Sequence, residues 1–222
     1  CIRDSATEVK IGIFFDNSWH PSDSNRTIPV INPTNGNAFT EIAAGNAADI
    51  DRAVRAARAA FDGAWGQLSA TERGRLLSKV GLLILEHFDE LATLEALDTG
   101  KPMKQAKADI TAAARYFEYY GAAADKVHGE TIPFMNGFFV TTEHLPHGVT
   151  GHIIPWNYPA QMFGRSLAPA LAMGNATVIK PAEDACLSSL RLAELCAEAG
   201  FPPGAINPVS YTHLTLPTKL SV

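Results

Sequence analysis

Residues 149–184 read VTGHIIPWNYPAQMFGRSLAPALAMGNATVIKPAED, and this stretch decides the fold class. Val149 to Ile154 is an apolar strand, Pro159 to Met173 has a helical pattern, and Ala176 to Lys180 is a second strand. Another helix is predicted from about Ser188 to Ala199. Strands that alternate with helices are typical of a parallel sheet with crossover connections. We therefore expect an α/β protein with a doubly wound sheet, whose ligands bind beyond the carboxyl ends of the strands.

The amino-terminal half is predicted to be a small β element followed by helices. Apolar periodicity and turn residues give this order: a strand at Ile11–Phe15 with a turn at Asn17–Trp19, a strand at Thr27–Ile31, and helices at Ala48–Phe61, from Ser69, at about Asp89–Thr99 and at Pro102 to about Lys126. In the first helix, Ile50, Val54, Ala57 and Phe61 recur at helical spacing. In the last helix, Ile110, Ala114, Phe117 and Gly121 share one side.

Two local signals give further boundaries. Ser69 and Glu72 have the spacing of a capping box, which satisfies exposed amide donors at the start of a helix. Thr131–Pro133 and Phe138–Leu145 are β-rich and flank Asn136-Gly137, a strong hairpin signal. We expect an extended arm at this hairpin.

Composition excludes several classes of protein. The chain has 222 residues, 46% of them hydrophobic, so it can build a substantial core. Its net charge of −5 and the lack of a basic run argue against nucleic acid or an anionic membrane as the main partner. No stretch approaches the roughly 20 apolar residues of a membrane span, and no secretory signal is recognisable. We expect a cytoplasmic protein, and its three cysteines fit a reducing compartment.

The two ends of the chain share an unusual relationship. DNA that encodes Cys1 to Ser5 has a reverse complement that, in another frame, encodes Pro-Val-Ser-Tyr-Thr, which is the sequence of residues 208–212. That DNA resembles the transposon end used in making sequencing libraries. We interpret residues 1–5 and 208–222 as sequencing artefacts, with a chance match as the alternative.

Polar residues follow both strands of the predicted sheet. Asn157 lies between Trp156 and Tyr158 after the first strand, where its amide N–H groups could stabilise an oxyanion or merely close a strand-to-helix turn. Lys180 and Glu183 end the second strand, where they could share one ligand or form a solvated ion pair. No glycine-rich dinucleotide signature of the G-x-G-x-x-G type occurs.

Several segments together resemble the aldehyde dehydrogenase superfamily in order and spacing. They are Leu97–Pro102, Ile153–Pro159, Leu171–Asn175, Val178–Asp184 and Gly200–Gly204. The resemblance extends from about Ile11 to Asn207. It implies a truncated aldehyde dehydrogenase fold: a partial Rossmann-like parallel sheet, an amino-terminal helical region and a β-hairpin oligomerisation arm. The implied divisions are 6–128 for the amino-terminal part of the cofactor-binding domain, 129–147 for the arm and 148–207 for the first half of the Rossmann-like sheet.

The resemblance assigns roles to individual residues. Asn157 matches the asparagine that stabilises the thiohemiacetal oxygen, and Glu183 matches a residue that favours NAD over NADP through the adenosine ribose. The cofactor-binding residues implied are Ile153, Ile154, Pro155, Trp156, Lys180, Ala182 and Glu183. Tyr158 and Met162 match residues of the aldehyde channel. Core packing is the alternative for the apolar residues among them.

The implied activity is oxidation of an aldehyde, a small-molecule substrate, to a carboxylic acid with NAD⁺. The family's nucleophilic cysteine and general-base glutamate lie beyond the sequence matched here, so we expect this chain alone to be inactive. Cys186 and Cys196 are interpreted as small buried residues, and the histidines lack metal-ligand spacing, so no metal is expected. Two alternatives stay open: transfer of the acyl group to coenzyme A or another acceptor, and a non-catalytic relative with the same fold. The whole protein is expected to form a homodimer or homotetramer.

His152 and Ser166 depart from the family pattern. His152 stands where relatives often have a smaller or amide residue, and Ser166 stands where many have lysine. Arg165 is a candidate to replace that lysine. These departures change the charges expected near the cofactor.

Overall fold

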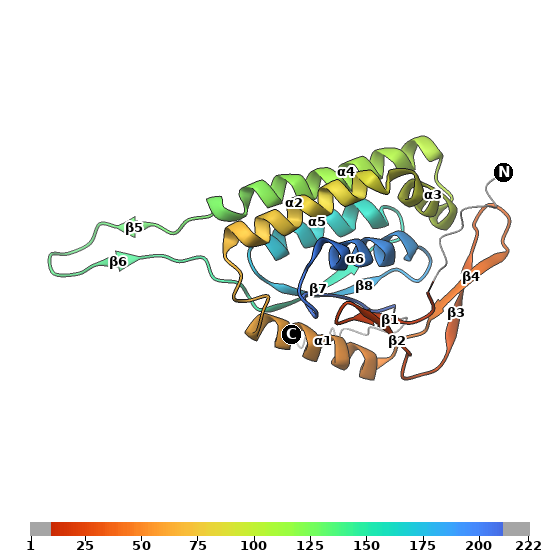
Figure 1. Cartoon of the computed structure of the whole chain (residues 1–222), viewed down its shortest axis with the longest axis horizontal. Helices are drawn as coiled ribbons and strands as arrows, with labels where there is room; N and C mark the ends of the chain where they lie inside the picture. Colours follow the sequence, from red (N-terminus) through yellow and green to blue (C-terminus); the bar gives the residue numbers. More distant parts are fainter. Residues whose placement is uncertain (1–9, 211–222) are drawn as a thin grey trace, which may run out of the picture.

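The centre of the protein is a parallel three-stranded sheet. The computed structural model describes residues 10–210. Within them, strands β7 (Val149–Ile154), β8 (Ala176–Pro181) and β9 (Ile206–Pro208) pair in the order β7-β8-β9, with both pairings parallel (Figure 1). The expected α/β class and parallel sheet are confirmed. The sequence did not indicate β9.

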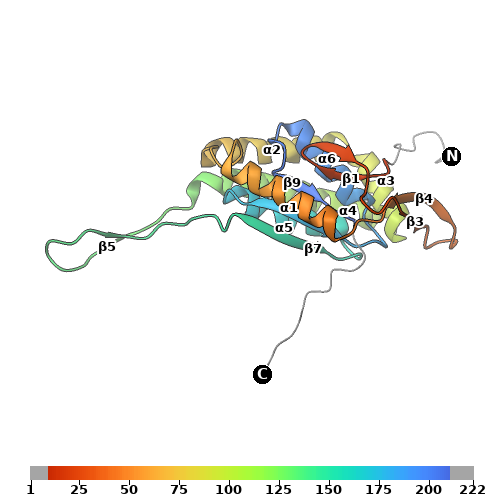
Figure 2. The same cartoon turned by 90° about the horizontal axis from the view of Figure 1, so that it is seen from below.

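Helices cover both faces of this sheet. One face packs against α1 (Ala47–Asp62), and the other packs against α5 (Pro159–Ala172) and α6 (Leu187–Ala199). The outer layer consists of α2 (Ala70–Glu86), α3 (Phe88–Thr99) and α4 (Met103–Ala123), followed by the short 3-10 helix η1 (Ala124–Lys126). In Figures 1 and 2, α2 and α4 lie beyond α5, on the side of the sheet opposite to α1. All the predicted helices are present.

The buried face of α1 agrees with the prediction except at Val54. Val54 is 40% exposed, whereas the buried side consists of Asp49 and the alanines Ala53, Ala56, Ala57 and Ala60. Small side chains let the helix lie close to β8 and β9. Of the four predicted apolar positions, Ala57 is buried and Ile50 and Phe61 pack against the main core, so only Val54 departs from the prediction.

The helix boundaries have clear causes. The Ser69 amide donates to Oε2 of Glu72 at 2.8 Å and the Glu72 amide donates to Oγ of Ser69 at 3.3 Å, so the predicted capping box is confirmed. Asn46 and Asp49 form a second capping box at the start of α1. Helix α3 ends at Gly100, whose φ of 74° lies in the left-handed region that glycine adopts readily.

Two small antiparallel hairpins precede the helices. Strands β1 (Ile13–Phe15) and β2 (Ser18–His20) pair with each other, as do β3 (Thr27–Ile31) and β4 (Ala38–Ala43). The turn of the first hairpin is Asp16-Asn17, both with positive φ, so the turn predicted at Asn17–Trp19 was placed too late. Ser18 and Trp19 instead belong to β2, where the Trp19 ring contacts the Phe14 ring edge-on.

A hairpin arm extends away from the body of the protein. Strands β5 (Thr131–Ile132) and β6 (Val140–Thr141) pair antiparallel, and Figure 1 shows their hairpin projecting from the end of α4. The amide of Phe138 donates to the carbonyl of Met135 at 3.2 Å, which closes a turn around Asn136-Gly137. The predicted hairpin is therefore present, with shorter strands than its β-rich segments suggested.

Residues at the carboxyl side of β9 pack into the fold. Residues 1–9 and 211–222 lie outside the described part of the chain. The segments interpreted as artefacts, residues 1–5 and most of 208–222, are therefore among those not described. Pro208, Val209 and Ser210 are described and buried. The Val209 amide donates to Ile179 O at 2.7 Å, and the Ser210 hydroxyl donates to Ala43 O at 2.7 Å. The origin of these residues stays a hypothesis.

Candidate active site at the carboxyl ends of β7 and β8

The predicted site residues leave the sheet at one edge. In the parallel register, Ile153 pairs with Lys180 and Ile154 pairs with Pro181. The segment Pro155–Tyr158 after β7 and the segment Ala182–Cys186 after β8 therefore begin side by side. This is the edge of a parallel α/β sheet at which ligands bind.

The segment Pro155–Tyr158, which we call the β7 loop, is exposed at all four positions. Trp156 is 61% exposed, and Ile153 just before the loop is 58% exposed. Ile154 is only 1% exposed and belongs to the main hydrophobic core, so a cofactor could meet only its backbone. Large apolar side chains in water are unfavourable, and the exposure of Ile153 and Trp156 is consistent with a surface that a ligand covers.

Lys180 and Glu183 lie on the neighbouring segment. The Lys180 Nζ lies 2.7 Å from Oε2 of Glu183, and the two side chains are 17% and 34% exposed. Ala182, between them, is half-buried and accepts the Ala185 amide at 3.2 Å, which closes a short turn. The ion-pair alternative is thus realised in the free protein, while both side chains remain partly accessible to a ligand.

Tyr158 and Met162 connect the β7 loop to helix α5. Tyr158 is 37% exposed and is the N-cap residue of α5, and its carbonyl accepts the Met162 amide at 2.8 Å. Met162 is half-buried and packs against the main core. Tyr158 is thus the last residue of the exposed loop, while Met162 lies in the first turn of α5 and is more buried.

A buried polar cluster lies beneath both segments, and the sequence did not indicate it. We call it the corner network, because it lies where α3 meets α4; it comprises Glu95, Asp98, Lys101, Asp109 and Ser188. Lys101 Nζ lies 2.8 Å from Glu95 Oε1 and 2.7 Å from Asp109 Oδ2. The same Nζ donates to the Asn157 carbonyl at 3.1 Å.

Burial and charge act on this network in opposite directions. Burial by itself would lower the pKa of Lys101, but hydrogen bonds and charge from Asp109 and Glu95 outweigh it and raise that pKa, so the ammonium stays charged. Asp98 is 1% exposed, and its burial outweighs the hydrogen bond from the Leu187 amide and raises its pKa to about 7. The network thus holds one firmly protonated cation and one carboxyl that titrates near neutrality.

Most of the chain is similar in sequence to known proteins of one family. A profile described as "Aldehyde dehydrogenase family" matches residues 19–218. The chain belongs to the aldehyde dehydrogenase family. It is 48% identical over 198 residues to "Retinal dehydrogenase 2" of Homo sapiens, covering 88% of this chain and 38% of that protein. It is 46% identical over 200 residues to "Aldehyde dehydrogenase, mitochondrial" of Equus caballus, covering 89% of this chain and 40% of that protein.

Solved structures agree with this membership. A crystal structure of PnpE in complex with nicotinamide adenine dinucleotide superposes with a TM-score of 0.90 at 42% identity. That alignment covers 92% of this chain and 42% of PnpE. The chain therefore spans about 40% of the length of its curated relatives, and it is the corresponding part of the aldehyde dehydrogenase fold.

The two described cysteines of this aldehyde dehydrogenase chain are buried free thiols. Cys186 and Cys196 are both 0% exposed. Burial raises the pKa of each thiol above its ordinary range, so neither is a thiolate near neutral pH. Because the thiolate is the attacking form, neither side chain is suited to be the nucleophile. Cys1 lies outside residues 10–210.

The departures at His152 and Ser166 are linked to each other. Nδ1 of His152 and Oγ of Ser166 lie 2.6 Å apart, and Nε2 of His152 lies 2.9 Å from Oγ1 of Thr150. Burial lowers the pKa of His152, so the ring is neutral near pH 7. This pair places no positive charge between β7 and α5. Arg165 is exposed on the same helix.

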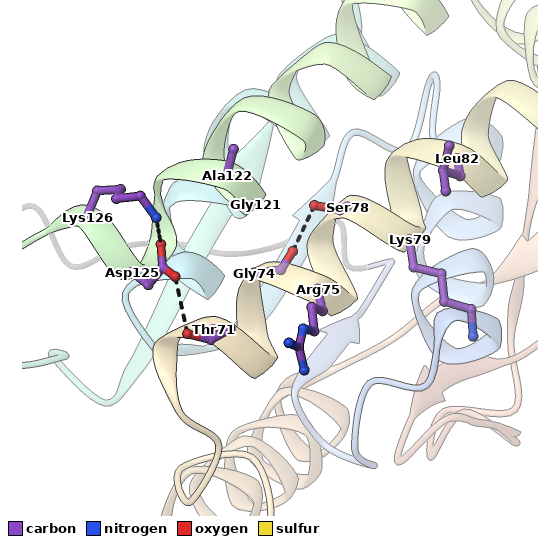
Figure 3. Close-up of a pocket in the computed structure, with 10 residues that line it drawn as sticks. All are labelled: Thr71, Gly74, Arg75, Ser78, Lys79, Leu82, Gly121, Ala122, Asp125 and Lys126. Carbon is purple, nitrogen blue, oxygen red and sulfur yellow. Dashed lines mark hydrogen bonds and ion pairs between the residues drawn. The ribbon is translucent and has the colours of Figure 1, made fainter.

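A separate groove lies between α2 and α4. It has a volume of about 400 Å³ and is lined by Thr71, Gly74, Arg75, Ser78, Lys79, Leu82, Gly121, Ala122, Asp125 and Lys126. Figure 3 shows Lys126 and Thr71 both directed toward Asp125. None of the predicted site residues lines it. Within residues 10–210, no group of three or more His, Cys, Asp or Glu side chains is arranged to hold a metal ion.

Proposed function

We propose that the whole protein containing this chain oxidises an aldehyde to a carboxylic acid with NAD, and that this chain supplies an oxyanion-stabilising amide and part of the dinucleotide site. The observation that carries the proposal is the register of β7 and β8, which brings Asn157 and the Lys180–Glu183 pair to one edge of the sheet. Membership of the aldehyde dehydrogenase family and the likeness to NAD-bound PnpE support it.

The residues at this edge fit an NAD molecule. The Glu183 carboxylate can accept hydrogen bonds from a ribose diol and would repel a 2′-phosphate, which favours NAD over NADP. Lys180 is close enough to Glu183 to donate to the same sugar. The exposed Ile153, Pro155 and Trp156 offer apolar surface, and Ile154 and Ala182 contribute backbone. When bound, NAD supplies the acceptor for the hydride.

Within this scheme the Asn157 side chain donates an N–H hydrogen bond to the aldehyde oxygen as negative charge develops on it. Donors that are held in place before the reaction stabilise such charge by several kcal/mol, because they need no reorganisation. Tyr158 and Met162 border the route by which the aldehyde approaches. The attacking thiol comes from a segment outside this chain, since Cys186 and Cys196 are buried and protonated.

We also propose that the whole protein assembles into a homodimer or homotetramer through the arm. Phe134, Phe138 and Phe139 on this arm are between 63% and 82% exposed. Exposed aromatic side chains and unpaired strand edges favour contact with another subunit. Replacing Phe134 and Phe139 by serine should reduce the mass measured by light scattering during gel filtration, while replacing the exposed Leu82 on α2 should not.

A cytoplasmic location is a further part of the proposal. Across residues 10–210 no helix has the length and apolarity that crossing a membrane requires. The buried free thiols of Cys186 and Cys196 suit a reducing compartment. Two relatives are named as mitochondrial, so cell fractionation should compare cytosol with mitochondria; recovery in mitochondria would contradict this part.

The experiment that tests the proposed activity measures NADH formation across a panel of small aldehydes. It compares this chain with the whole protein that contains it. Activity in the whole protein alone is the expected result. Activity in the isolated chain would mean that Cys186 or Cys196 can act as the nucleophile. The proposal that the attacking thiol lies outside this chain would then be wrong.

A further inference from the structure

We propose that Lys101 is a positioning residue for Asn157, and that the corner network fixes the β7 loop and the start of α6 relative to each other. The proposal rests on the proposed function only where it concerns catalysis. Its structural part, that a buried ammonium holds the loop bearing Asn157, can be tested without any turnover.

Lys101 contacts the β7 loop directly. Its Nζ donates to the Asn157 carbonyl at 3.1 Å and lies 4.9 Å from the centre of the Tyr158 ring. The Lys101 side chain is only 10% exposed, although all four residues of the β7 loop are exposed. A charged donor shielded from water binds a carbonyl more strongly than an exposed one does. Lys101 therefore restrains the backbone of the residue whose side chain is proposed to act.

The ammonium of Lys101 is itself held by two buried carboxylates. A lysine side chain is flexible, so it can position another group only if its own ammonium is fixed. Glu95 and Asp109, which are 0% and 2% exposed, both bind that ammonium. Asp109 is held in turn by Gln105 Nε2 at 2.8 Å. These carboxylates use two of the three N–H groups of Lys101, and the third is directed to Asn157.

The same network also binds the start of α6. Glu95 Oε2 accepts the Ser188 hydroxyl at 2.5 Å, and Asp98 Oδ2 accepts the Leu187 amide at 2.8 Å. Both acceptors bind the first turn of α6, which directly follows Ala182–Cys186. Glu95 thus lies one hydrogen bond from Lys101 and one from α6. Glu95 therefore connects the β7 loop, which bears Asn157, with α6, which follows the segment that bears Glu183.

Three variants of the whole protein test this inference. Lys101→Met keeps the apolar stem but removes the ammonium. Lys107→Met, on α4, is the matched control because its ion pair with Asp89 is exposed. The double variant Lys101→Met with Asp109→Asn restores the net charge of the network, in case the single variant folds poorly. It still lacks the donor to Asn157.

The first readout is steady-state kinetics of aldehyde oxidation. We expect Lys101→Met and the double variant to lower kcat by about tenfold or more, since small misplacements of a positioned group are costly. The KM for NAD should stay within about twofold, since these variants leave Lys180 and Glu183 intact. Lys107→Met should match the wild type. An unchanged kcat in a correctly folded Lys101 variant would overturn the catalytic part of the inference.

The second readout is amide hydrogen exchange in the absence of substrate. The amides of Trp156, Asn157 and Tyr158 should exchange faster in both Lys101 variants, while those of β8 should not change. Equal exchange at the loop in variant and wild type would overturn the structural part. If the wild type fails to oxidise any aldehyde, the proposed function fails, but the exchange result still decides whether Lys101 positions this loop.

Discussion

The Nζ of Lys180 lies 2.7 Å from Oε2 of Glu183, at the carboxyl end of the middle strand of the sheet. The pair is only partly exposed, so its two charges can act on a ligand that reaches this edge. A carboxylate at this place can accept hydrogen bonds from a sugar diol, whereas it would repel a phosphate. The arrangement gives a direct prediction about the choice of cofactor.

Glu183→Gln should improve the use of NADP by the whole protein. The amide keeps the shape of the side chain but removes the negative charge that opposes a 2′-phosphate. We expect kcat/KM for NADP to rise by about tenfold, equivalent to about 1.4 kcal/mol, with a smaller loss for NAD. Kinetics with both cofactors give the ratio, and Glu86→Gln at an exposed position is the control. A constant ratio would mean that Glu183 does not contact this part of the cofactor.

Gly74→Ala should destabilise the packing of α2 on α4. A Cβ atom at Gly74 would lie 2.5 Å from the Gly121 carbonyl oxygen, so the helices would have to separate. We expect a loss of about 1–3 kcal/mol in the free energy of unfolding, the usual cost of overpacking. Gly151→Ala is the control, because a Cβ atom there meets nothing within 4 Å. Urea denaturation of both variants measures the difference, and equal stabilities would contradict the close approach of these helices.

Asp98→Asn should change how stability depends on pH. In the folded protein Asp98 has a pKa of about 7, above its ordinary value of 3.8. The folded state therefore binds the proton more tightly than the unfolded state. The contribution of Asp98 to stability is fully present below about pH 4 and is lost as the pH rises to about 7, at about 1.4 kcal/mol per pH unit.

Asparagine at position 98 cannot lose a proton, so this contribution should be absent from the variant. The free energy of unfolding of the variant, relative to that of the wild type, should rise between about pH 4 and pH 7 and then remain constant. Denaturant titrations at several pH values measure it. A difference that does not vary with pH would show that the Asp98 carboxyl is ionised throughout this range in the folded protein.

The strands beside the site could be predicted because their signals are local. Val149–Ile154 and Thr27–Ile31 are short apolar runs bounded by turn residues. For each strand, the predicted first and last residues agree with the structure. Strand β9 carried no such signal: it has only three residues and ends in Pro208. Its pairing with β8 depends on the rest of the fold, which brings Ile206 beside Thr177. Patterns within a short window do not contain that information.

The site itself was predictable in part. The motif around Asn157 and the segment from Lys180 to Glu183 mark the two loops, and the parallel sheet brings them to one edge. The segment Leu97–Pro102 contains Asp98 and Lys101, but the sequence pattern indicated no role for these residues. Glu95 carried no signal, because Glu95 and Asp98 have the spacing of an ordinary solvated helix surface. Only the packing of α3 against α4 and α6 buries them and brings Lys101 to Asn157.

If Asn157 stabilises the developing oxyanion, replacing it by alanine in the whole protein should lower kcat for aldehyde oxidation. We expect a fall of about 10²–10³-fold, the effect of removing one oxyanion donor, with little change in the KM for NAD. The exposed Asn37→Ala serves as the control and should retain full activity. A kcat in Asn157→Ala equal to that of the wild type would show that Asn157 does not stabilise the oxyanion.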